Sequence, residues 1–152
     1  MKINKSVEQA VFVTLMLALQ KNHTPVKSGV LSTKLGVSDS YLKKILRQLV
    51  VAGLVQSSAS KDGGYQLAKS IETITLFDLY EAVESKQFTY TSEELARNLF
   101  SNEEHIKQSE QKIINAFNNG FNDFYKQLKL VHLSELLEEG KYENGCIEWD
   151  KE

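Results

Sequence analysis

Cysteine is almost missing from this sequence: its 152 residues include one, Cys146. A single thiol excludes an intrachain disulfide framework, and it excludes a zinc or cluster site built from several thiolates of one chain. Thiol reactivity depends on an environment that a sequence does not show. Cys146 is therefore either a redox thiol, open to oxidants or to pairing across a dimer, or a tail residue without a role.

Long hydrophobic runs are missing as well. The longest run near the N-terminus, AVFVTLMLAL over residues 10–19, is too short to cross a bilayer. It also lacks the small-residue cleavage site of a signal peptide. We therefore expect a cytoplasmic protein, long enough for one compact domain or for a small domain with a helical arm.

Acidic residues are scarce in one half of the chain only. Residues 1–70 contain 10 Lys and Arg against 3 Asp and Glu, whereas residues 71–152 contain 8 against 17. The total net charge of −2 hides this asymmetry. A basic first half points to a surface for a polyanion, and the acidic remainder cannot serve that purpose.

Apolar residues at three- and four-residue spacing predict helices over residues 5–21, 26–36 and 38–53. Gly36 suits the left-handed end of the second helix, and Ser38 suits the N-cap of the third. In the third helix, Leu42, Ile45, Leu46, Leu49 and Val50 form the expected buried stripe. Two short helices joined by a three-residue turn are typical of a helix-turn-helix.

Two strand-like runs follow, LVQSS at 54–58 and YQLAK at 65–69, around the turn sequence ASKDGG. The Asp-Gly-Gly of this turn supplies residues able to adopt positive φ, as a hairpin requires. We expect Tyr65 to pack beneath the hairpin. A helix-turn-helix followed directly by a hairpin is a winged helix, so the predicted fold is mainly α with a small β-hairpin.

Most of the sequence after the hairpin is predicted to be helical. Thr75 and Asp78 have the spacing of a capping box, which predicts a helix from residue 76 to about 84. After a less regular segment at 88–100, one apolar stripe covers a helix of more than 20 residues that needs a partner, unless Gly120 breaks it in two. LSELLEE at 133–139 predicts a last short helix. The stripe consists of Ile106, Ile113, Phe117, Phe121, Phe124 and Leu128.

VSDSYLKKILRQLVVAGLVQSS, DGGYQLAK and TITLFDLYEAVE together resemble the Rrf-two (Rrf2) family of bacterial winged-helix transcription regulators. The shared motifs cover about half of the chain, in order and at matching intervals. The resemblance implies a winged helix-turn-helix domain over 1–85, a helical dimerisation region over 86–140 with the six stripe residues at the interface, and a tail over 141–152. It also implies a homodimer that presents two recognition helices to a palindromic operator.

The chain departs from the family pattern in two places. Members that carry an iron–sulfur cluster have three cysteines ahead of the dimerisation helix, whereas residues 85–107 here contain none. We therefore expect no cluster, no other cofactor and no metal, and we interpret His105 as a surface residue. The wing has Ala59 and Ser60 where many members have Arg-Gly, which predicts weaker or different contacts from the wing.

Reading the major groove requires an exposed helix face that donates to base edges, with flanking groups on phosphate. We assign Ser40, Tyr41 and Lys44 to base edges. Contacts to phosphate are expected from the N-terminus of the second helix and from the wing. The residues for these contacts are Lys27, Ser28 and Lys61. Ser38, Lys43 and Arg47 are assigned to phosphate or to base edges.

The leading hypothesis is a sequence-specific, homodimeric DNA-binding repressor without a metal. The alternative is a winged-helix scaffold that binds proteins rather than DNA and uses its acidic second half. An enzyme is disfavoured, because no nucleophile–base pair, phosphate loop or metal-ligand spacing stands out. The operator, the regulated genes and the effector, whether an oxidant or a small molecule, stay open.

Overall fold

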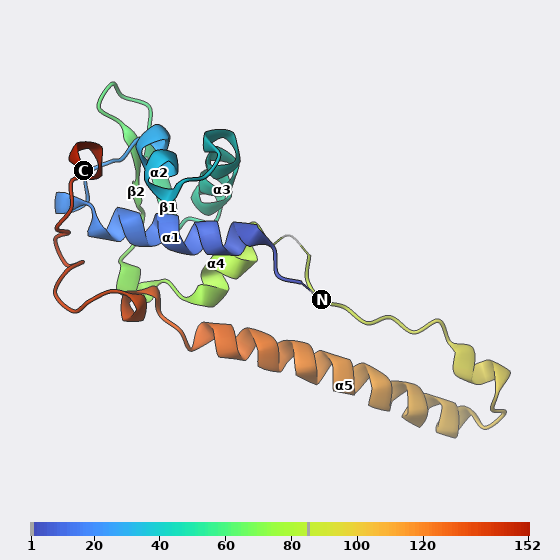
Figure 1. The fold of residues 1–152 in the computed structure, drawn as a ribbon. Helices are drawn as coiled ribbons and strands as arrows, with labels where there is room; N and C mark the ends of the chain where they lie inside the picture. The colour runs from blue at the N-terminus through green and yellow to red at the C-terminus, as the bar shows by residue number, and fades with distance from the viewer. Residues whose placement is uncertain (1, 85) are drawn as a thin grey trace. The chain divides into compact units, whose positions relative to one another are not determined.

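The computed structural model describes residues 2–84 and 86–152, which divide into two compact units (Figure 1). The first contains the residues up to 84 together with 129–152, and the second contains residues 86–128. Helices dominate both units, and the strands form one two-stranded hairpin. The predicted fold class is confirmed. In the described part of the chain, no helix combines the length and the hydrophobicity of a transmembrane segment.

Helix α1 (Lys5–Leu19) forms the centre of the first unit. It packs against α2, α3, α4 and β2, and Figure 1 shows it passing between the α2–α3 pair and α4. The sequence predicted one apolar face, but Val13, Met16 and Leu17 are buried as well. A helix that is apolar nearly all round is covered on nearly all sides. Thr14 is buried with its hydroxyl donating to the carbonyl of Ala10 at 2.7 Å.

The helix-turn-helix consists of α2 (Ser28–Leu35) and α3 (Asp39–Val51). Gly36 ends α2 with φ of 70°, the left-handed conformation that glycine adopts at no steric cost. The hydroxyl of Ser38 accepts from the amide of Tyr41, which confirms the predicted N-cap of α3. Both ends of the turn are thus fixed by local chemistry.

The wing is an antiparallel hairpin of β1 (Val55–Ser58) and β2 (Gly64–Leu67), with Val55 opposite Leu67. Gly64 has φ of 153°, and a Cβ there would lie 2.5 Å from the carbonyl of Val26, so the position admits only glycine. Tyr65 exchanges backbone hydrogen bonds with Val26 and packs against the core, as predicted. The wing is therefore anchored to the chain just ahead of α2.

Helix α4 (Leu76–Val83) follows a short 3-10 turn, η2 (Ile71–Thr73). The predicted capping box is confirmed: the hydroxyl of Thr75 accepts from the amide of Asp78, whose carboxylate accepts from the amide of Thr75 at 2.8 Å. Leu79, Tyr80 and Val83 are buried on the inner face.

The second unit contains η3 (Leu95–Asn98) and all but the last residue of the long helix α5 (Glu103–Lys129). Helix α5 runs unbroken through Gly120, which decides between the two alternatives that the sequence left open. The segment ahead of η3 lies along this helix: Phe88 stacks on Phe121 with ring centroids 5.4 Å apart, and Tyr90 stacks on Phe117 at 4.7 Å.

The C-terminal segment differs from the prediction. Residues 133–139 form a 3-10 turn, η4 (Leu133–Leu136), rather than an α-helix. The expected tail, residues 141–152, docks on the end of α1 and the adjoining turn η1 (Lys21–His23) and ends in η5 (Trp149–Lys151). Ile147 pairs with Gln20 in a parallel bridge, and the indole of Trp149 donates to the carbonyl of Met16 at 2.8 Å.

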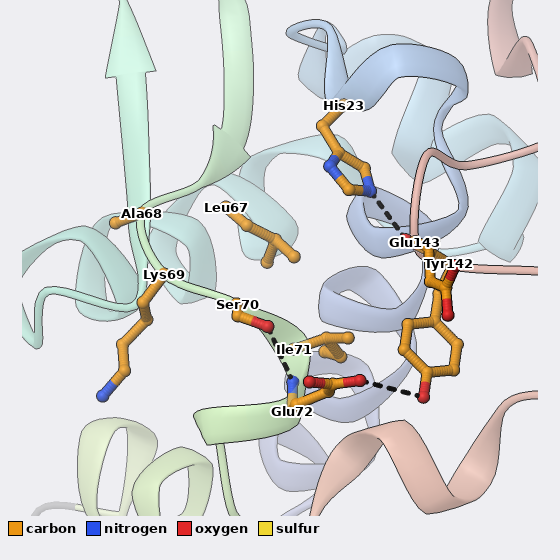
Figure 2. A pocket seen from close by; sticks show the side chains of 9 residues that line it. All are labelled: His23, Leu67, Ala68, Lys69, Ser70, Ile71, Glu72, Tyr142 and Glu143. Atoms are coloured by element: carbon orange, nitrogen blue, oxygen red, sulfur yellow. Dashed lines mark hydrogen bonds between the residues drawn. The ribbon is translucent and has the colours of Figure 1, made fainter. Parts of the chain in front are cut away.

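A cleft borders this docked segment (Figure 2). His23 points from η1 to the carbonyl of Tyr142, with Nε2 at 2.8 Å, and the hydroxyl of Tyr142 lies 3.4 Å from a carboxylate oxygen of Glu72. Burial, followed by the charge of Glu72, raises the pKa of Tyr142, so this hydroxyl keeps its proton at neutral pH. Residues 141–152 thus belong to the first unit and are not a free tail.

Candidate nucleic-acid interface

The outer face of α3 is polar and basic over a fully buried apolar stripe. Leu42, Ile45, Leu46 and Leu49 are at most 1% exposed, so they fix the rotation of the helix about its axis. The side chains opposite them are directed to solvent. They are Ser40, Tyr41, Lys43, Lys44 and Arg47, all exposed. The structure therefore brings together five of the predicted site residues on one accessible face.

Asp39 controls the start of this face. Its carboxylate lies 3.3 Å from Nζ of Lys43, one turn further along α3, and accepts a 3.2 Å hydrogen bond from Ser32 of α2. Burial alone would raise the pKa of Asp39, but the hydrogen bonds from Lys43 and Ser32 and the charge of Lys43 outweigh it and leave the pKa lowered. Asp39 thus stays ionised, links α2 to α3 and holds Lys43.

The N-terminus of α2 lies beside the wing. Lys27 is the exposed N-cap residue and makes no side-chain capping bond to the helix; its Nζ instead donates to the carbonyl of Lys61 at 3.1 Å. Ser28, the first residue of α2, is half-buried. The first amides of a helix point outward and carry the positive end of its dipole, so this edge suits an anion.

The wing presents few charges. Ala59, Ser60 and Lys61 are exposed in the loop between the strands, and the Ser60 hydroxyl lies 3.1 Å from that of Ser58. Lys61 is the basic side chain of this loop, and Asp62 follows it. The wing therefore offers one ammonium group, that of Lys61, and it lacks the arginine that many family members carry there.

The six stripe residues of α5 differ in accessibility. Ile106 is 2% exposed and is therefore unavailable to a partner, whereas Ile113 and Phe117 are each 47% exposed. Phe121, Phe124 and Leu128 are half-buried. Phe88 and Tyr90, which were not predicted, extend this stripe into an aromatic cluster. Their alternation at positions 88 and 90 was the available signal in the sequence.

Another feature missed from the sequence is an acidic segment beside α2. Turn η5 packs against α2, and Nζ of Lys34 donates to the carbonyl of Glu152. The cleft beside His23 has a volume of about 440 Å³. A second cleft, of about 510 Å³, lies between α2, the wing and the C-terminal segment. The charged residues that line the second cleft are Lys27, Asp62, Glu148, Asp150 and Lys151. No local sequence pattern predicts the contact between α2 and the C-terminal segment, because it joins residues more than 100 positions apart.

The chain matches one family model over residues 3–139, described as "Rrf2: Iron-dependent Transcriptional regulator". The match covers the helix-turn-helix, the hairpin and α5, and it includes every predicted DNA-contact residue.

The side chains present do not fit an iron–sulfur cluster. Such clusters take several thiolates, and Cys146 is exposed in the docked C-terminal segment, where its amide donates to the carbonyl of Leu19 at 2.8 Å. Across residues 2–84 and 86–152, no three His, Cys, Asp or Glu side chains gather as a metal site would require. His105 instead contacts the ring of Phe100 edge-on at 4.7 Å.

Relatives agree with this family match. The chain is 41% identical to YwgB of Bacillus subtilis over 105 residues, 69% of this chain and 67% of that protein. It is 34% identical to YffB of Lactococcus lactis over 142 residues, 93% of this chain and 90% of that protein. Both carry the name of HTH-type transcriptional regulators.

Solved structures share the fold. CymR, the global cysteine regulator of B. subtilis, superposes with a TM-score of 0.63 at 22% identity, over 90% of this chain and 95% of that one. IscR of T. potens gives 0.60 at 21% identity, over 100% and 97%. From the family model and these relatives, the chain belongs to the Rrf2 family of helix-turn-helix transcriptional regulators.

Proposed function

We propose that this protein represses transcription in the cytoplasm by binding a palindromic operator as a homodimer, with α3 of each subunit in the major groove. The observation that carries the proposal is the face of α3: polar and basic side chains held outward over a buried stripe. The N-terminus of α2 and the wing flank this face on the same unit. The proposal assigns no enzymatic reaction and no metal to the chain.

In the proposed complex, Ser40, Tyr41 and Lys44 contact base edges. These residues lie in the first two turns of α3, the part of a recognition helix that enters the groove. The phosphate contacts come from both sides of the helix and fix its position on the duplex. They are Lys27, Ser28, Ser38, Lys43, Arg47 and Lys61. Lys43 exchanges Asp39 for phosphate when the complex forms.

Helix α5 supplies the dimer contact in this proposal. The large apolar side chains of Ile113 and Phe117 are about half exposed to water, and a second copy of the helix would cover them. A two-fold dimer places two copies of α3 on successive turns of one face of the duplex, so the operator has matching half-sites.

Gel-shift or polarisation titration with DNA from upstream of the protein's own gene tests the proposal. Each neutralised phosphate adds about 0.9 to the slope of log affinity against log salt, so a dimer with six or more contacts binds with strong salt dependence. A dimeric sample that shows no sequence-selective, salt-sensitive binding would contradict the proposal. A promoter–reporter fusion then distinguishes repression from activation.

A further inference from the structure

We infer that the acidic C-terminal segment, residues 148–152, is an autoinhibitory strap that weakens DNA binding at the α2 and wing edge of the interface. The inference rests on the proposed function, since it concerns the same surface. It adds a regulatory element from the opposite end of the chain.

The strap is held in place by specific contacts of Trp149 and of residues 145–147, the three residues ahead of the strap. The amide of Lys21 donates to the carbonyl of Ile147 at 2.7 Å, and the amides of Cys146 and Ile147 both donate to the carbonyl of Leu19. The amide of Trp149 donates to the side chain of Gln20 at 3.2 Å. Gly145, with φ of 68°, lets the segment pass so close to Gln20 that a Cβ would collide with its carbonyl.

This anchoring delivers carboxylates to the edge where phosphate is proposed to bind. Turn η5 packs beside α2, and Glu148 and Asp150 line one cleft with Lys27. The main chain of Glu152 accepts from Lys34 in the last turn of α2. Residues 148–152 contain three carboxylates and one ammonium group, Lys151, which pairs with Glu148 at 3.2 Å.

The strap therefore makes this edge of the interface less positive. Lys27, Lys61 and the α2 amides favour an anion, but Asp62, Glu148 and Asp150 face the same cleft or its rim. Lys151 offsets one of these charges. Unpaired carboxylates near a phosphate path repel the duplex at low salt, and this repulsion weakens as salt rises, because the Debye length shortens to about 10 Å at about 0.1 M.

The test is the double variant D150N/E152Q, which removes two exposed negative charges and no salt bridge that the structure contains. Its matched control is E138Q/E139Q, which makes the same change in net charge just after η4. In Figure 1, η4 lies on the other side of α1 from α2. Glu148 is left in place because of its pair with Lys151.

Binding is measured by fluorescence polarisation against a random-sequence duplex of about 30 base pairs, because the phosphate term is independent of sequence. We expect D150N/E152Q to bind about three- to tenfold more tightly than wild type at low salt, with the gain shrinking as salt rises. E138Q/E139Q should gain less than half as much. Near-ultraviolet circular dichroism confirms that both variants keep the native fold.

The outcomes separate the two proposals. If wild type binds and D150N/E152Q gains no more than E138Q/E139Q, the strap inference is overturned and the proposed function stands. If only D150N/E152Q binds, the strap inference is supported in its strongest form. If no form of the protein binds DNA at low salt, the proposed function fails and the inference fails with it.

Discussion

The carboxylate of Asp39 accepts a hydrogen bond of 3.2 Å from the hydroxyl of Ser32, which ties the first residue of α3 to the body of α2. The same carboxylate holds Lys43 at 3.3 Å. One side chain therefore both sets the angle between the two helices and keeps a proposed phosphate contact occupied until DNA is present.

Replacing Asp39 with Asn tests the structural half of this role. The pKa of Asp39 is lowered on folding, so its contribution to stability is present above the unfolded pKa of about 4 and is lost as the pH falls through the folded pKa. At neutral pH, Asp39→Asn should unfold at lower denaturant than wild type. The difference should shrink as the pH is lowered below about 4.

Asp62→Asn, at an exposed position of the wing loop, is the control for the loss of one carboxylate. Equal denaturation midpoints for wild type and Asp39→Asn at neutral pH would show that the Ser32 and Lys43 contacts do not stabilise the fold.

Lys44 is the test of base recognition. Lys44→Glu puts a negative charge beside the duplex, and the proposed dimer carries two copies of a contact worth about 1–3 kcal/mol, so DNA affinity should fall by about 30-fold or more. The side chain is exposed, so the melting temperature should stay close to that of wild type. Lys141→Glu makes the same charge change after η4 and should bind almost normally. A Lys44→Glu protein that binds as tightly as Lys141→Glu would remove Lys44 from the interface.

The elements that sequence predicted correctly depend on contacts within a few residues. The stripe from Leu42 to Leu49 repeats at helical spacing, so the buried face of α3, and hence its exposed face, follows from the order of residues alone. The Ser38 cap and the Thr75–Asp78 capping box are interactions between residues three apart. Local periodicity and local hydrogen bonds were enough to predict the winged helix and the candidate recognition face.

The features that sequence did not predict depend on distant partners. The indole of Trp149 donates to the carbonyl of Met16, 133 residues away, and nothing near Trp149 in the sequence indicates that contact. The continuity of α5 was undecidable from propensity, because a glycine costs about 1 kcal/mol in a helix. Aromatic packing of Phe117 and Phe121 on either side of Gly120 favours the unbroken helix.

Trp149 reports directly on the docking of the C-terminal segment. Trp149→Phe keeps an aromatic side chain but removes the 2.8 Å hydrogen bond from the indole to the carbonyl of Met16, so the free energy of unfolding should fall by about 1 kcal/mol or more. Chemical denaturation measures this loss. Trp149 is the only tryptophan of the chain, so its emission in wild type should shift to the red as the segment undocks. Unchanged stability of Trp149→Phe would show that the bond contributes nothing net.

Ile113 tests the proposed dimer contact without disturbing the aromatic cluster. Its side chain is 47% exposed, and it lies one turn from the Phe117–Tyr90 stack. In the proposed two-fold interface two copies meet, and each still has about half of its side chain to bury, which contributes about 0.7–1.5 kcal/mol, so Ile113→Glu should raise the dimer dissociation constant by about 10-fold or more. Sedimentation equilibrium measures that constant.

The matched control for this prediction is Asn118→Glu, which adds the same charge to α5 about 140° around the helix from Ile113. It should remain as dimeric as wild type, and its affinity for a palindromic duplex should be unchanged. Ile113→Glu, by contrast, should bind that duplex weakly and one half-site at a time, because each α3 then loses the linkage that brings the second half-site within reach. If both variants sediment as wild-type dimers, the interface lies outside this stripe, and the pairing of recognition helices must be set by another surface of the chain.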